Sequence, residues 1–173
     1  MNEMSRNLWS MAYAVFVKWW PQNQWFPFAG YACAYFANRI GAETAEHIVI
    51  DRNVTFPSKT HMGDYARIGH NCELHGVVHL GNHVLMAPEV VSYNVNHEHG
   101  SLSSPTDLQG DATMEPIYVG IDVWLGRRVM MMPGVHIGDD GIIGAGAVVT
   151  KDLPPYSVGG GVSCRVIGSR LSS

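Results

Sequence analysis

The chain has little charge and few cysteines for its size. Of 173 residues, 15% are Asp, Glu, Lys or Arg, 46% are hydrophobic and three are cysteine. A chain this apolar is not typical of intrinsic disorder, and it can form the core of one domain. Its 11 basic and 15 acidic residues give a formal net charge of −4, which argues against a nucleic-acid partner. The cysteines form no Cys-x-x-Cys pair, so we expect reduced, buried thiols in a cytoplasmic protein at Cys33, Cys72 and Cys164.

An uninterrupted apolar run is also missing. Residues 19–38 carry no charge, but Pro21, Pro27 and the polar residues between them break the stretch, and a lipid-exposed helix could not satisfy that backbone. Glu3 and Lys18 flank the first apolar run closely, unlike a signal peptide. We therefore predict no transmembrane segment, and a helical N-terminal segment over residues 1–43, with helices at about 8–20 and up to 39. Its aromatic residues would pack against the domain or a partner, with peripheral membrane contact as the alternative.

From residue 50 onward the sequence repeats with a period of six. A large apolar residue recurs at every sixth position, glycine often follows it directly, and a small or β-branched residue comes four places later. This period is neither helical nor a simple alternation. It predicts a flat-sided parallel β-solenoid in which the large residue fills the centre and glycine relieves backbone strain. The core positions are Ile50, Phe56, Met62, Ile68, Leu74, Leu80, Met86, Val119, Leu125, Met131, Ile137, Ile143 and Val149.

The two blocks of the repeat are out of phase. Ser92 would hold the next core position, but the pattern resumes only at Val119, 27 residues later. Residues 98–118, which are polar and rich in turn formers, must therefore leave the coil as a loop. A long excursion from a regular scaffold is commonly functional, so the residues at its entrance, above all His97, are candidates for chemistry.

Several segments around this break form an ordered set. They are residues 93–98 (YNVNHE), 116–126 (PIYVGIDVWLG), 133–138 (PGVHIG), 143–155 (IGAGAVVTKDLPP) and 161–167 (GVSCRVI). Together they resemble the galactoside, maltose and surface-polysaccharide O-acetyltransferases of the hexapeptide-repeat superfamily. The resemblance implies a mainly β fold, a left-handed parallel β-helix over residues 44–167 with the loop 98–118 and a C-terminal tail at 168–173. It also implies a cytoplasmic homotrimer, each of whose sites is shared by two chains.

The activity that this resemblance implies is direct transfer of an acetyl group from acetyl-CoA, a co-substrate, to a hydroxyl of a sugar-type acceptor, with no metal required. The general base would be His97. An alcohol is a poor nucleophile at neutral pH, and an imidazole can remove its proton as the thioester is attacked. The sequence does not decide whether Glu98 or a backbone carbonyl orients the ring. The acceptor could be a free sugar, a nucleotide-sugar, a lipid-linked glycan or another alcohol or amine.

The resemblance also assigns residues to the two substrates. The coenzyme would contact Ala145, Thr150, Lys151 and Arg165, together with Arg127, which stands where sugar acetyltransferases often have serine near the thioester oxygen. Trp124 would wall the thioester region beside the acceptor. Arg67 replaces an acceptor-binding asparagine of galactoside enzymes, which argues against a simple galactoside and leaves room for an anionic acceptor.

Two alternatives involve metal. His61, His79 and His97 are eighteen residues apart, so they would stack on successive turns of a three-sided coil and could hold a metal ion. The segment 69–76, with His70 and His75, resembles the zinc motif of γ-class carbonic anhydrases, but the upstream histidine and its Arg-Gly-Asp signature are absent. A catalytically inactive solenoid is the third alternative. The remaining His47, His83 and His136 are expected at surfaces or turns.

Overall fold

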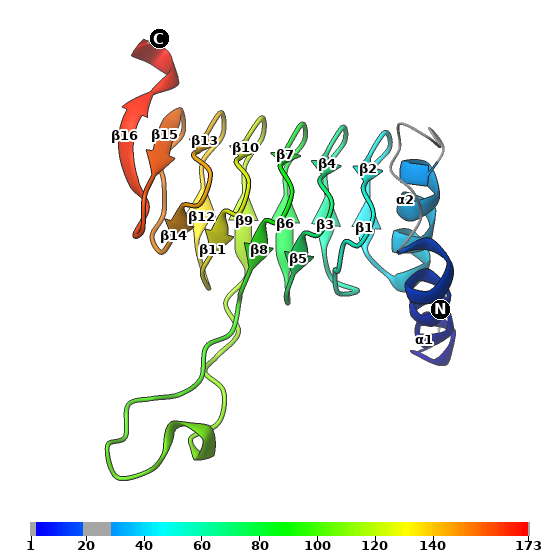
Figure 1. Ribbon diagram of the computed structural model, residues 1–173, viewed down its shortest axis with the longest axis horizontal. Helices are drawn as coiled ribbons and strands as arrows, with labels where there is room; N and C mark the ends of the chain where they lie inside the picture. The colour runs from blue at the N-terminus through cyan, green and yellow to red at the C-terminus, as the bar shows by residue number, and fades with distance from the viewer. Residues whose placement is uncertain (1–2, 19–28, 173) are drawn as a thin grey trace.

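The computed structural model describes residues 3–18 and 29–172, and in it the chain forms a parallel β-helix with helices at its N-terminal end (Figure 1). Helix α1 covers Glu3–Ala12 and continues as a π-helical turn, Tyr13–Val17, while α2 covers Ala29–Ile40. The predicted helical segment is therefore present, although its first helix starts about five residues earlier than expected. The predicted end of that helix at 20, and the turn that follows it, lie outside the described residues.

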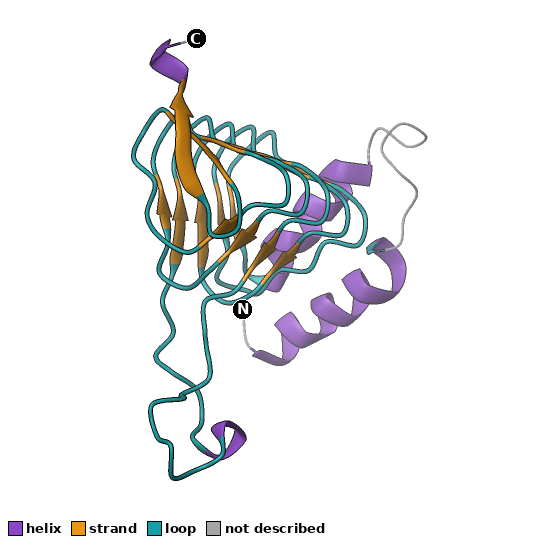
Figure 2. Cartoon of the chain, turned by 60° about the vertical axis from the view of Figure 1, so that its left-hand side comes forward, coloured by secondary structure: helices purple, strands orange, loops and turns teal. Residues whose placement is uncertain are grey.

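The coil has three faces, each a parallel sheet (Figure 2). The first face consists of β1 (Glu43–Thr44), β3 (His61–Met62), β6 (Val78–Leu80), β9 (Ile117–Val119) and β12 (His136–Ile137). The second consists of β2 (Val49–Ile50), β4 (Arg67–Ile68), β7 (Leu85–Met86), β10 (Trp124–Leu125), β13 (Ile142–Ile143), β15 (Ser157–Gly160) and the antiparallel β16 (Arg165–Ser169). The third consists of β5 (Glu73–Leu74), β8 (Val91–Ser92), β11 (Met130–Met131) and β14 (Val148–Val149).

The interior follows the hexad pattern. All thirteen predicted core residues are buried, from Leu125 and Met131 at 0% exposure to Phe56 at 8%. Because successive strand residues point to opposite faces of a sheet, the residue before each core position points outward. All three cysteines are buried, as expected, and burial raises the pKa of the Cys33 and Cys72 thiols to about 11. The prediction of a mainly β solenoid is confirmed.

The glycines of the repeat have a different role from the one predicted. Those that follow the core residues do not adopt a left-handed φ; that conformation falls at the corners, mostly on other residues such as Asn53 (φ 54°) and Glu89 (φ 64°). Instead, successive turns approach too closely at these glycines for a side chain. A Cβ on Gly63 would lie 2.5 Å from the backbone of Gly81, and one on Gly126 would lie 2.6 Å from the nitrogen of Ala145. Close stacking of the turns, rather than relief of strain, requires glycine here.

The helices close the N-terminal end of the core. Cys33, Ala37 and Ile40 of α2 are buried in the same hydrophobic cluster as the first coil. Tyr13 packs against Phe56 with ring centroids 5.4 Å apart, and its hydroxyl donates to the carbonyl of Val54 at 3.0 Å. The helical segment therefore covers apolar surface that the first coil would otherwise expose to water.

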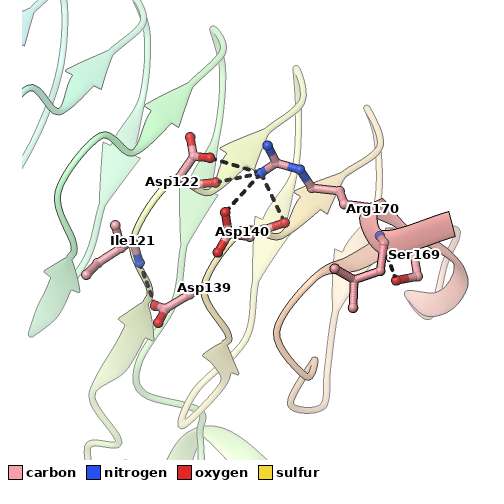
Figure 3. Close-up of polar contacts among 7 residues, drawn as sticks. Ile121, Asp122, Asp139, Asp140, Ser169 and Arg170 are labelled. Atoms are coloured by element: carbon pink, nitrogen blue, oxygen red, sulfur yellow. Dashed lines mark hydrogen bonds and ion pairs between the residues drawn. The ribbon is translucent and has the colours of Figure 1, made fainter. Parts of the chain in front are cut away.

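At the other end, β16 turns back along β15 and a 3₁₀ turn, Arg170–Ser172, follows it. Arg170 Nη1 donates to the side chain of Asp122 at 3.1 Å and to the carbonyl of Asp140 at 3.2 Å (Figure 3). Asp122 and Asp140 occupy the same corner on successive turns. The predicted tail at 168–173 is thus structured through Ser172 and bonded to the coil.

The loop leaves the coil at the corner between the third and first faces, which we call the loop corner (Figure 2). Ser92 holds its core position, fully buried, and the chain separates after Asn94. The amide of Glu115 donates to the carbonyl of Asn94 at 2.8 Å, and β9 begins at Ile117. The excursion therefore starts before residue 98 and ends before residue 118.

Candidate active site

His97 lies at the base of the loop, with a side chain that is 74% exposed. Its Nδ1 lies 2.8 Å from Oδ1 of Asp111, which is on the returning arm of the loop. In the neutral ring, a proton on Nδ1 would face this carboxylate, which can only accept, and Nε2 would keep a lone pair. The carboxylate beside the ring is thus that of Asp111, which the sequence reasoning missed, since it named only Glu98 or a backbone carbonyl as the partner of the ring.

Backbone pairing holds these two side chains in register. His97 and Asp111 face each other in an antiparallel bridge. On either side of this bridge, the amide of Glu98 donates to the carbonyl of Gly110 at 2.9 Å, and that of Ala112 to Asn96 at 2.8 Å. The base of the loop is thus a short ladder, which fixes the imidazole outside the apolar core.

The tip of the loop is tied together by one side chain. The Gln109 amide nitrogen donates to the carbonyls of Ser101, at 2.9 Å, and Ser104, at 2.7 Å, and its oxygen accepts from the amide of Ser101 at 3.0 Å. A 3₁₀ turn at Thr106–Leu108 precedes it. Although the loop projects from the coil (Figure 2), its conformation is defined by these bonds.

Arg127 and Ala145 lie on successive turns of the corner between the second and third faces. The amide of Gly146 donates to the carbonyl of Arg127 at 2.8 Å, which joins the two turns. The Arg127 guanidinium is bound to the carboxylate of Glu89, which also accepts from Nε of Arg128 at 2.5 Å. Hydrogen bonding to Arg127 and then Arg128 lowers the pKa of Glu89 to about 2, so the carboxylate stays ionised at neutral pH. Arg127, the predicted departure from the family's common serine, is thus held in an ion pair with Glu89.

Thr150, Lys151 and Arg165 lie toward the C-terminal end of the coil. Thr150 Oγ1 is hydrogen-bonded to Oγ of Ser163, in the turn that leads into β16, and Arg165 opens that strand opposite Gly160. Lys151 is exposed at the loop corner, two turns beyond the loop, which corresponds to about 10 Å along the axis. The Thr150–Ser163 bond therefore joins the residue after β14 to the turn that leads into β16.

Arg67 and Trp124 both point outward from the second face. Arg67 is on β4 and Trp124 on β10, and the outward side chain between them is Leu85 of β7. Trp124 is 50% exposed and Leu85 is 45% exposed. In a three-sided coil the second face lies opposite the loop corner. Within one chain, Arg67 and Trp124 therefore lie on the opposite side of the coil from His97.

The first face carries a groove of about 770 Å³ that the sequence reasoning did not predict. Its floor includes a ladder of stacked rings, His61, His79, Tyr118 and His136, with successive centroids 4.3, 4.6 and 4.7 Å apart. Asp152 to Pro155, which follow Lys151 and continue the first face beyond β12, line the C-terminal end of the groove. Burial, together with the neighbouring His61, lowers the pKa of His79, which favours the neutral ring in the stack. The sequence does contain a signal for this ladder, because a histidine or tyrosine stands one position before successive core residues of this face.

The predicted stack of three histidines is wrong in its last member. His61 and His79 stack, but the next residue in register is Tyr118, because position 97 already belongs to the base of the loop. His70 and His75 lie on either side of β5, and His75 stacks on Tyr93. Within residues 3–18 and 29–172, no three His, Cys, Asp or Glu side chains are grouped so that they could hold a metal ion. The arrangement does not favour the carbonic anhydrase alternative.

Comparison with known proteins agrees with this geometry. Residues 116–151 match the family described as bacterial transferase hexapeptide (six repeats). The Escherichia coli protein named "Putative colanic acid biosynthesis acetyltransferase WcaF" is 30% identical over 178 residues, which cover 99% of this chain and 91% of that protein. Galactoside O-acetyltransferase of the same species is 45% identical over 91 residues, but the match spans only 43% of its length.

A solved structure, galactoside acetyltransferase in complex with coenzyme A, superposes with a TM-score of 0.79 at 28% identity, over 98% of this chain and 84% of the other. The likeness therefore extends over the helices and the whole coil.

Proposed function

This chain belongs to the hexapeptide-repeat acetyltransferases, which take an acetyl group from acetyl-CoA, and we propose that it transfers this group to a hydroxyl of a sugar-type acceptor with His97 as general base. The observation that carries the proposal is the His97–Asp111 pair at the exposed base of the loop, because a neutral ring with its Nδ1 proton toward the carboxylate has Nε2 free to accept a proton. The test is release of free coenzyme A from acetyl-CoA in the presence of a panel of sugars, nucleotide-sugars and lipid-linked glycans.

The pair supports a single direct transfer. Nε2 of His97 takes the acceptor hydroxyl proton as the oxygen attacks the thioester carbonyl. The carbon–sulfur bond then breaks, and Nε2 returns the proton to the departing sulfur, so that the free thiol and the acetyl ester are the products. Between these steps the ring is an imidazolium, which the Asp111 carboxylate stabilises.

We also propose that the working unit is a trimer with parallel coils. The second face, with Arg67 and Trp124, lies opposite the loop corner, so a neighbouring chain must bring these side chains to His97. The ring-lined groove beside the loop corner would then face a neighbour's second face. A cyclic trimer closes such contacts without leaving one unpaired. The three buried thiols and the use of acetyl-CoA favour the cytoplasm as the place where the trimer works.

Lys151 and Arg165 are expected to bind the phosphates of the coenzyme. Both are exposed near the C-terminal end of the coil, so neither contributes to the packed core. Lys151→Ala and Arg165→Ala should each weaken acetyl-CoA binding by about tenfold, the effect of losing one charge-assisted hydrogen bond, and leave the melting temperature unchanged. Calorimetric titration measures both affinities. Unchanged affinity in both variants would remove these residues from the site.

Arg67 is expected to select the acceptor. Its exposed guanidinium, on the same face as Trp124 and separated from it by β7, suits a phosphate or carboxylate. Arg67→Asn should raise the KM for an anionic sugar about tenfold or more and change that for a neutral galactoside little. Steady-state kinetics with a matched neutral and phosphorylated sugar measures the ratio. Equal turnover of the two sugars, unaffected by the substitution, would contradict this role.

A further inference from the structure

The N-terminal helix exposes an apolar stripe that nothing in the proposed site uses. Met4, Leu8, Met11 and Val15 are 78%, 68%, 67% and 66% exposed. Their spacing of four, three and four residues places them on one side of α1 and its π-helical extension. We call these four residues the helix stripe.

The other side of the same helix is already packed. Trp9 meets the rings of Tyr35 and Phe36 edge-on, at centroid distances of 6.3 and 5.5 Å, and Tyr13 is buried against the first coil. Core packing therefore uses the opposite side of α1 and does not involve the helix stripe. It is a second apolar side on a helix whose first apolar side is occupied.

Helix α2, which packs on the other side of α1, exposes side chains of another kind. Tyr31 and Tyr35 are 57% and 51% exposed, and the Arg39 guanidinium lies 5.2 Å from the Tyr35 ring centroid and 5.6 Å from that of Trp9. Trp9 therefore joins this row to the packed side of α1. We call the helix stripe together with Tyr31, Tyr35 and Arg39 the end patch. Flexible apolar side chains beside tyrosine and arginine are typical of surfaces that lie at a lipid–water boundary.

The charge distribution along the chain agrees with an anionic partner. No acidic residue lies between Glu3 and Glu43, whereas three basic residues, Arg6, Lys18 and Arg39, do. The remaining 14 acidic residues, against eight basic ones, all lie from Glu43 onward. The helical end is thus basic and the coil acidic, and the helices occupy one end of the prism (Figure 1).

We propose that the end patch docks on the surface of a bilayer that contains anionic lipids. The apolar stripe enters the boundary between headgroups and acyl chains, and the net positive charge of the helical segment favours anionic headgroups. The protein lies on the bilayer, because no helix in the described part of the chain is long and apolar enough to cross it. A second copy of this chain fits less well, since it would bring two basic ends together. This inference is independent of the acetyl-transfer chemistry.

The test is co-sedimentation of the full-length protein with vesicles. Vesicles of phosphatidylcholine with phosphatidylglycerol should carry the protein down, vesicles of phosphatidylcholine alone should carry less, and added salt should weaken the binding. The double variant Leu8→Gln/Met11→Gln should lose at least about tenfold in vesicle affinity, because each exposed side chain gives up apolar burial in lipid. Met4→Gln/Val15→Gln should give a similar loss.

A matched control is available at the opposite end of the prism. Ile167 and Leu171 are 73% and 76% exposed, so Ile167→Gln/Leu171→Gln removes comparable apolar surface far from the end patch and should bind vesicles like the wild type. Light scattering and melting temperature should be unchanged in all three double variants, since the residues contribute little to the core. The proposal is overturned if the wild type stays in solution with both vesicle types or if the control loses as much as the stripe variants. It is also overturned if the stripe variants change the assembly state, which would identify the stripe as a contact between protein chains.

Discussion

Replacing His97 with alanine should lower kcat by about a hundred- to ten-thousand-fold, the usual contribution of a positioned general base. The imidazole lies beside Asp111, the antiparallel bridge at the base of the loop holds its backbone, and the residue lies outside the hydrophobic core. Its removal leaves no cavity, so we expect a near-normal melting temperature and near-normal affinity for acetyl-CoA. Coenzyme release with a confirmed acceptor measures kcat, and calorimetry measures the affinity.

Asp111→Asn tests the geometry behind this prediction. An amide in place of the carboxylate no longer requires a proton on Nδ1 and does not stabilise the imidazolium. We expect a smaller loss in kcat than for His97→Ala, with the KM for acetyl-CoA unchanged. His99 is the control: its Nδ1 contacts the carbonyl of His97 at 3.0 Å, so His99→Ala removes a neighbouring ring and leaves the Asp111 pair in place. Retention of most activity by His97→Ala would show that His97 is not the base, and His99 would be the next residue to test.

The coil could be predicted because its constraints are local and repeated. Each turn places one large residue inward, so a residue such as Leu125 or Met131 follows from position in the hexad alone. The break in this pattern located the loop and directed attention to His97. Features that depend on the adjacent turn are harder to predict from the sequence: glycine at Gly63 and Gly126 suggests relief of backbone strain, but the actual constraint is the close backbone of the next turn.

The partner of His97 could not be found in the same way. Asp111 lies fourteen residues further along a loop without periodicity, and only the pairing of the two loop arms brings it to the ring. The ring ladder of the first face shows the opposite case. His79, Tyr118 and His136 occupy equivalent outward positions, but His79 was predicted to stack with His61 and His97, and His136 was considered alone as a surface or turn residue. Recognising them required the register of the turns on either side of the loop.

The separation of the predicted site residues within one chain leads to the second prediction. Trp124 lies on the face opposite the loop corner, so a site that contains both Trp124 and His97 takes them from two chains. Trp124→Ala should lower kcat/KM by at least about tenfold, because it removes a half-exposed aromatic wall. On its own, this loss would not show which chain supplies the tryptophan.

Mixed trimers answer that question. Two impaired variants, His97→Ala and Trp124→Ala, are co-expressed with different affinity tags and purified through both tags in turn, so that only trimers containing both variants remain. Suppose that each site takes His97 from one chain and Trp124 from the next chain in cyclic order. In every such trimer, about a third of the sites then have both side chains intact. The preparation should therefore regain about a third of wild-type activity. The two variants purified separately and mixed after assembly serve as the control and should stay impaired as long as chains do not exchange. If the site lay within one chain, no site in a mixed trimer would hold both residues. Co-expressed protein no more active than the control would therefore contradict the shared site, and with it the need for a trimer in catalysis.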